Sequence, residues 1–151
     1  AVGSIFMMPH LGVLAQVHRD AALEVFHHDC LVPLGVCVSP TGEAKEGKAI
    51  LNYSIQFADG RTEKGTLQGG EMKLFPLPTG ESATGTFTPS RGFDLGAGAG
   101  KELLNVKLTG GVVGIILDGR GRPLRIPTEK QMRIRKLREW FDALGVYPPL
   151  R

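Results

Sequence analysis

Short stretches of alternating apolar and polar residues recur about every ten residues between positions 30 and 127, with turn residues between them. This spacing constrains the fold most, because strands so short are stable only when several of them pair and bury a shared face. The clearest strand is AILNYSIQF at residues 49–57, and the Asp-Gly pair that follows it predicts a hairpin. Leu51, Tyr53, Ile55 and Phe57 are expected on one face of this strand, and Ile50, Asn52, Ser54 and Gln56 on the other. The pattern predicts a mainly β fold, an antiparallel β-sandwich or small β-barrel of about seven or eight short strands.

The other expected strands share short length, β-branched or aromatic residues and flanking glycine or proline. They are residues 30–38, where Pro33 marks an edge or a bulge, and residues 62–68, 71–77, 81–89, 101–111, 112–117 and 122–127. No helical pattern alternates with these strands, so a parallel nucleotide-binding sheet is not expected.

Helical periodicity is confined to the two ends of the chain. Residues 1–29 predict a helical lead-in that breaks around His18 to Asp20, with Asp20 placed to cap a second, shorter helix. Residues 128–145 predict an amphipathic helix with Thr128 as N-cap and Gly145 at its C-terminal end. Its apolar stripe is Ile134, Leu137, Trp140, Phe141 and Leu144. We expect residues 1–151 to form one domain with its β core at residues 30–127, as a fragment of a larger chain.

Charge is spread unevenly along the chain, whose formal net charge is +3. Residues 118–151 hold nine basic and four acidic side chains. This basic surplus predicts either contact with an acidic partner or a helix face that is simply exposed to solvent. The longest apolar run, near residues 112–117, is too short to span a bilayer, and no membrane partner is expected. Cys30 and Cys37 lie in apolar contexts, which predicts two buried free thiols and a cytoplasmic location.

The glycine-rich stretch DLGAGAGKE at residues 94–102 resembles a phosphate-binding loop without meeting its requirements. Leu95 stands where the first glycine should be, and Glu102 stands where a magnesium-binding hydroxyl should be. The next segment alternates like a strand, whereas a phosphate loop opens a helix. The stretch is therefore expected to connect two strands, and no cofactor is predicted.

Four potential metal ligands follow one another in HHDC at residues 27–30. Successive helical residues diverge by about 100°, so these four cannot all reach one ion. No serine stands in a nucleophile-elbow motif, and neither cysteine has activating neighbours. No catalytic, cofactor-binding or metal-binding residue is predicted, and enzymatic activity is left open.

The most distinctive stretch is DGRGRPLRIP at residues 118–127, where Arg120, Arg122 and Arg125 surround a tight turn. Guanidinium groups bind carboxylates and phosphates in a two-pronged geometry. Intramolecular salt bridges or a protein contact are the favoured uses. Nucleic-acid binding is less favoured, because no aromatic residue interleaves with the basic residues before Trp140.

Four segments, in this order, resemble the C-terminal extension of glutamate mutase L-like proteins, which belong to the actin-like ATPase superfamily. They are FMMPHLGVLAQVHRDAALEVF, DCLVPLGVCVSPTGEAKEG, LFPLPTGESATGTFTPSRGFDLGAGAGK and GGVVGIILDGRGRPLRIP. The family's phosphate loop is absent from this sequence, so its ATPase activity does not carry over. The resemblance implies an accessory β-rich domain beside an ATPase that is associated with B12-dependent mutases.

Three hypotheses follow. The first is a non-catalytic accessory domain that docks a protein partner or other domains of its parent chain through Arg120, Arg122 and Arg125. The second is a basic nucleic-acid-binding β-barrel, and the third is an enzyme with a composite Cys/His or metal site.

Overall fold

The computed structural model describes residues 2–3 and 7–145 of the chain. It divides into two compact units, Ala1–Leu34 and Gly35–Arg151. Among the described residues, no helix has both the length and the apolar character needed to cross a membrane.

The first unit is mainly helical. It contains α1 (Met8–Val17), α2 (Arg19–Val25) and a π-helical turn (Phe26–Cys30), and the short strands β1 (Val2–Gly3) and β2 (Leu31–Val32) pair antiparallel. The predicted break lies at His18, whose extended backbone separates the two helices. His18 itself caps α2, because its Nδ1 accepts a hydrogen bond from the Ala21 amide at 3.2 Å. The prediction of Asp20 as the cap was therefore wrong, and Asp20 lies in the first turn instead.

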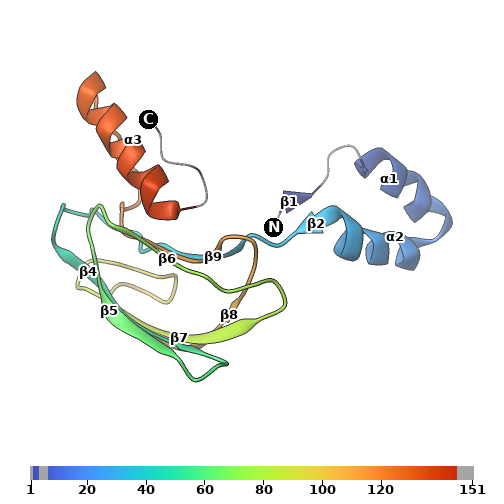
Figure 1. The fold of residues 1–151 in the computed structure, drawn as a ribbon, viewed down its shortest axis with the longest axis horizontal. Helices are drawn as coiled ribbons and strands as arrows, with labels where there is room; N and C mark the ends of the chain where they lie inside the picture. The colour runs from blue at the N-terminus through green and yellow to red at the C-terminus, as the bar shows by residue number, and fades with distance from the viewer. Residues whose placement is uncertain (1, 4–6, 146–151) are drawn as a thin grey trace. The chain divides into compact units, whose positions relative to one another are not determined.

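The second unit contains two β-sheets and one helix (Figure 1). The larger sheet is antiparallel with the order β5-β4-β7-β8, and the smaller has the order β3-β9-β6. The strands are β3 (Gly35–Val38), β4 (Ala49–Phe57), β5 (Thr62–Gln68), β6 (Met72–Phe75), β7 (Ser82–Pro89), β8 (Leu103–Thr109) and β9 (Gly114–Asp118). The mainly β prediction is confirmed, and within the described residues the two sheets do not close into a barrel. One pairing departs from the antiparallel arrangement that was predicted, because β3 runs parallel to β9.

Two predicted strands differ from the structure at prolines. Residues 30–38 do not form one strand, because the chain leaves β2 before Pro33 and starts β3 only at Gly35. Residues 122–127 do not form a strand, since Pro123 has no amide hydrogen to donate and only Arg122 makes a bridge, to Gly42. The arginine-rich stretch is therefore a loop.

The core lies between the two sheets of the second unit. The predicted inward face of β4 is buried, and it meets residues of the opposite sheet such as Ile115 and Leu117. Ile50, expected on the outer face, is also buried with 1% of its surface exposed. A register irregularity between Ala49 and Leu51 changes the direction of the side chain at this position.

The C-terminal helix α3 (Lys130–Leu144) packs against β6, on the side of the smaller sheet that faces away from the larger one (Figure 1). Glu129, rather than Thr128, caps it by accepting hydrogen bonds from the amides of Gln131 and Met132. Gly145 ends the helix with a left-handed φ of 61°, as predicted. Of the predicted apolar stripe, Trp140 alone is buried, so the helix covers this face of the sheet only in part.

Candidate functional site

A buried carboxylate at the end of β9 organises the arginine turn, which we define as residues 118–125. Asp118 is 1% exposed, and alternation along β9 places its side chain on the face of the smaller sheet that α3 covers. Its Oδ1 and Oδ2 accept hydrogen bonds from Nε and Nη2 of Arg120, both at 2.8 Å. Oδ1 also accepts from the Arg120 amide at 3.0 Å, and Oδ2 accepts from Nη2 of Arg122 at 2.6 Å. One carboxylate therefore fixes two of the three predicted arginines.

These contacts decide the ionisation of Asp118. Burial by itself raises the pKa of the carboxyl, but the hydrogen bonds from Arg120 and Arg122 outweigh it and lower the pKa to about 2. In return, the hydrogen bond with Asp118 raises the pKa of Arg120. The three groups thus form a charged cluster at neutral pH.

Arg120 also links the turn to α3. Its guanidinium carbon lies 4.8 Å from the ring centroid of Trp140, which is the geometry of a cation–π contact. The chain of contacts runs from Asp118 through Arg120 to Trp140. It therefore ties the C-terminal helix to the end of a central strand.

The turn is also held on its other side, by the loop that follows β3. Gly42 and Arg122 exchange two backbone hydrogen bonds of 3.2 Å each. Gly121 has a φ of 85°, and a Cβ there would lie 2.9 Å from the Cβ of Ala44. The glycine in Arg-Gly-Arg is thus required by both backbone conformation and close approach.

The three predicted docking arginines therefore have different environments. The side chains of Arg120 and Arg122 are 21% and 37% exposed, and both are bound to Asp118. The Arg125 side chain is 76% exposed and forms an ion pair of 3.0 Å with the equally accessible Glu43. Arg125 alone is free to face a partner, since an ion pair between exposed groups is weak.

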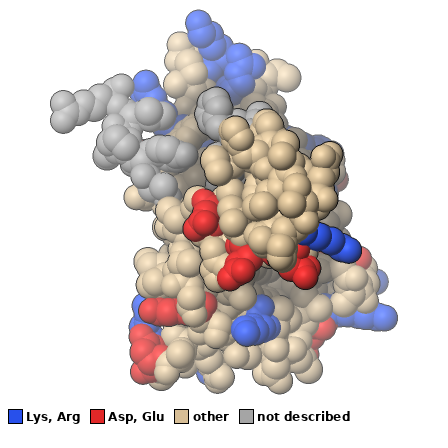
Figure 2. All heavy atoms as spheres, turned by 90° about the vertical axis from the view of Figure 1, so that its right-hand side faces the viewer, with Lys and Arg blue, Asp and Glu red and all other residues tan. Residues whose placement is uncertain are grey.

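Helix α3 adds further cations next to this turn. It carries five basic and two acidic side chains, and Figure 2 shows Lys and Arg gathered at the top of the view, where α3 lies. Lys130, Arg133 and Arg138 are exposed and make no ion pair with any other residue in the described part of the chain. Composition indicated a basic C-terminal region, but the structure identifies which of its charges are unpaired.

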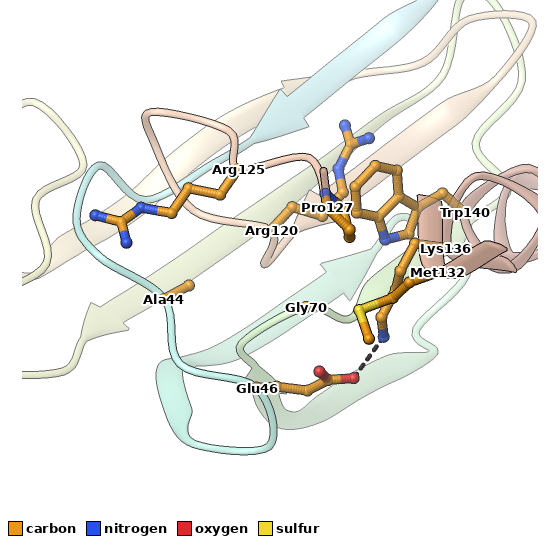
Figure 3. A pocket seen from close by; sticks show the side chains of 9 residues that line it. All are labelled: Ala44, Glu46, Gly70, Arg120, Arg125, Pro127, Met132, Lys136 and Trp140. Atoms are coloured by element: carbon orange, nitrogen blue, oxygen red, sulfur yellow. Dashed lines mark hydrogen bonds and ion pairs between the residues drawn. The ribbon is translucent and has the colours of Figure 1, made fainter. Parts of the chain in front are cut away.

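A pocket of about 170 Å³ lies between the turn, the loop after β3 and α3 (Figure 3). Met132, Lys136 and Trp140 line it at four-residue intervals, which places them in one row along the helix. Lys136 Nζ pairs with Glu46 Oε1 across the pocket at 2.5 Å and with Glu139 Oε2 at 3.0 Å. The hydrogen bond to Glu46 raises the pKa of Lys136, and it lowers that of Glu46. The four-residue spacing was visible in the sequence, whereas the loop opposite it was not.

In the glycine-rich loop at residues 94–102, backbone amides are hydrogen-bonded to an aspartate of the same loop. Asp94 Oδ1 accepts hydrogen bonds from the amides of Gly96 and Gly98, at 2.7 and 2.9 Å. The loop then leads into strand β8, as predicted, and not into a helix. Those amide groups therefore serve to close a strand connection.

The cysteines and histidines are not assembled into a site. Cys30 is buried as predicted, but the expectation for Cys37 was wrong, because that residue is exposed on β3; both are free thiols. Burial of the sulfur itself and the nearby Asp118 nevertheless raise the pKa of Cys37. Within residues 2–3 and 7–145, no three His, Cys, Asp or Glu side chains converge as a metal ion would require.

Comparisons of the chain with protein-family models, with curated proteins and with solved structures found no match.

Proposed function

We propose that the Gly35–Arg151 unit is a non-catalytic accessory domain that docks an acidic protein surface. The observation that carries this proposal is the set of unpaired, exposed cations on α3, with Arg125 beside them. The sequence resemblance supports a parent or partner of the glutamate mutase L-like type, in which the domain serves an actin-like ATPase. The two unpaired thiols suit a cytoplasmic setting.

Asp118 gives Arg120 and Arg122 a supporting role in this function. Because both guanidinium groups already bind a buried carboxylate, they hold the turn and α3 in place and leave contact with the partner to Arg125, Arg133 and Arg138. An acidic surface is the partner favoured by this arrangement, since complementary charge speeds association and selects against basic proteins.

The test is a binding titration between this chain and the ATPase domain of a glutamate mutase L-like protein. We expect association that weakens with added salt and that falls by about tenfold or more in the double variant Arg133→Glu, Arg138→Glu. Lys64→Glu, on exposed β5, is the matched control and should leave the affinity within about twofold. No association at low salt, or equal losses in both variants, would refute docking through α3. Retention on DNA with a steep salt dependence would favour the nucleic-acid hypothesis instead.

A further inference from the structure

One polar group in the pocket lacks a partner. The Trp140 indole Nε1 is fully buried, the residue is 9% exposed, and no described residue accepts its hydrogen bond. In Figure 3 this nitrogen is turned toward the side of the pocket where Lys136 and Gly70 lie. An indole N–H can only donate, and leaving a buried donor unpaired is unfavourable. An acceptor atom that reached this nitrogen would remove the cost of the unpaired donor.

The second donor is Lys136, one helical turn before Trp140. Spacing of four residues places both side chains on the same face of α3. The Lys136 ammonium has three hydrogens, and two of them are used by Glu46 and Glu139. Three cationic side chains line the pocket, Arg120, Arg125 and Lys136, and Glu46 is the one carboxylate in the lining. Arg120 and Arg125 also pair with carboxylates outside the lining, Asp118 and Glu43. An acceptor that also carries negative charge fits this lining best.

Glu46 shows which chemistry the pocket accepts. Its carboxylate reaches Lys136 from the opposite loop, yet its side chain remains 74% exposed. The Lys136 side chain is only 19% exposed, but the Glu46 end of the pair lies in solvent, so another carboxylate can compete with it for Lys136. The volume of about 170 Å³ is more than ten times the ~10–15 Å³ that one water needs.

We propose that this pocket binds a carboxylate, held between Lys136 Nζ and Trp140 Nε1–H in competition with Glu46. The carboxylate belongs either to a small molecule or to an acidic side chain of a polypeptide. The two donors of the pocket, Lys136 and Trp140, differ from the docking cations Arg133 and Arg138 of the same helix, whereas Arg125 belongs to both surfaces.

The chain contains one tryptophan, so its single indole N–H signal in a ¹⁵N–¹H spectrum reports on this pocket alone. The protein is titrated with succinate, with an uncharged succinamide control, and with a blocked peptide of three aspartates. We expect the indole signal to move downfield and to saturate with succinate, with the peptide or with both, but not with succinamide. A response to only one of the two carboxylate probes identifies the source. No shift with either, or an equal shift with succinamide, would overturn the proposal.

Two variants make the test specific. Lys136→Met should weaken binding by about tenfold or more, whereas Lys130→Met, at an exposed unpaired position of the same helix, should not change it. Glu46→Gln should tighten binding by about two- to fivefold, because it removes the internal competitor. Weaker binding in Glu46→Gln would contradict competition at Lys136. The wild-type titration stands even where a variant is destabilised.

Discussion

Replacing Asp118 with asparagine should destabilise the second unit more than any other single loss of charge in the described residues. Asparagine keeps the shape, but it removes the negative charge that four hydrogen bonds from Arg120 and Arg122 surround. Breaking a buried ion pair costs about 3–5 kcal/mol. The Arg120 and Arg122 side chains are 21% and 37% exposed, so water can solvate them once the charge of Asp118 is gone. We therefore expect the free energy of unfolding to fall by about 2–3 kcal/mol.

The effect should also depend on pH in a defined direction. The pKa of Asp118 is about 2 in the folded protein, below the value of about 3.9 expected in the unfolded chain. A lowered folded pKa stabilises the protein fully above the unfolded value and loses this contribution as pH falls. The gap between wild type and Asp118→Asn should therefore be constant from about pH 7 to 5 and shrink by roughly 1–2 kcal/mol toward pH 2.

Urea unfolding followed by the fluorescence of the single tryptophan measures this directly, since Trp140 lies in the same unit. A loss of about 2–3 kcal/mol corresponds to a midpoint lower by roughly 1–2 M urea. The control is Asp59→Asn, whose carboxylate is 63% exposed and lies 3.6 Å from Arg61, and it should cost less than about 1 kcal/mol. An Asp118→Asn variant within about 0.5 kcal/mol of wild type, or a gap that does not change with pH, would refute this account of the turn.

Two further predictions concern backbone strain and thiol reactivity. Gly114→Ala should cost more than about 2 kcal/mol in the same assay, because φ is 92° and the added Cβ would lie 2.5 Å from the Phe75 carbonyl oxygen. Gly47→Ala, with φ of 72° and open space around it, should cost only about 1 kcal/mol, and equal losses would show that close approach is irrelevant. A thiol reagent should modify Cys37 slowly at pH 7 and faster as pH rises, since its pKa is raised, while buried Cys30 stays protected in the native protein. Removing the Asp118 charge should speed the reaction of Cys37, and rapid modification of both thiols would contradict these environments.

Local patterns predicted much of this fold because the relevant physics is local. Alternation in residues 49–57 identified β4, and the Asp-Gly pair identified its hairpin with β5. Gly145 ended α3 where a residue with left-handed backbone was expected. Each of these signals depends on neighbours within a few positions, so one sequence is sufficient to read them.

The candidate site depended on contacts that local patterns do not contain. Nothing around Asp118 indicates that it is buried, because its neighbour across the sheet, Met72, comes from β6, and its partner Arg120 lies against Trp140 of α3. The same is true of Glu46, which reaches Lys136 across 90 positions of sequence. The arginines were therefore predictable from the sequence, but which of them are fixed and which are exposed was not. The apolar neighbours of Trp140 indicated a core residue and gave no sign that its indole N–H is an unpaired donor.

Contact between an acidic protein partner and the exposed cations of α3, with Arg125, can be measured residue by residue. Mapping of backbone ¹⁵N–¹H signals during titration with the ATPase domain of a glutamate mutase L-like protein tests it most directly. We expect the largest changes at Arg125, Arg133 and Arg138, and little change at the β4–β5 hairpin around residues 57–62. Changes centred on that hairpin, or none at any partner concentration, would contradict it.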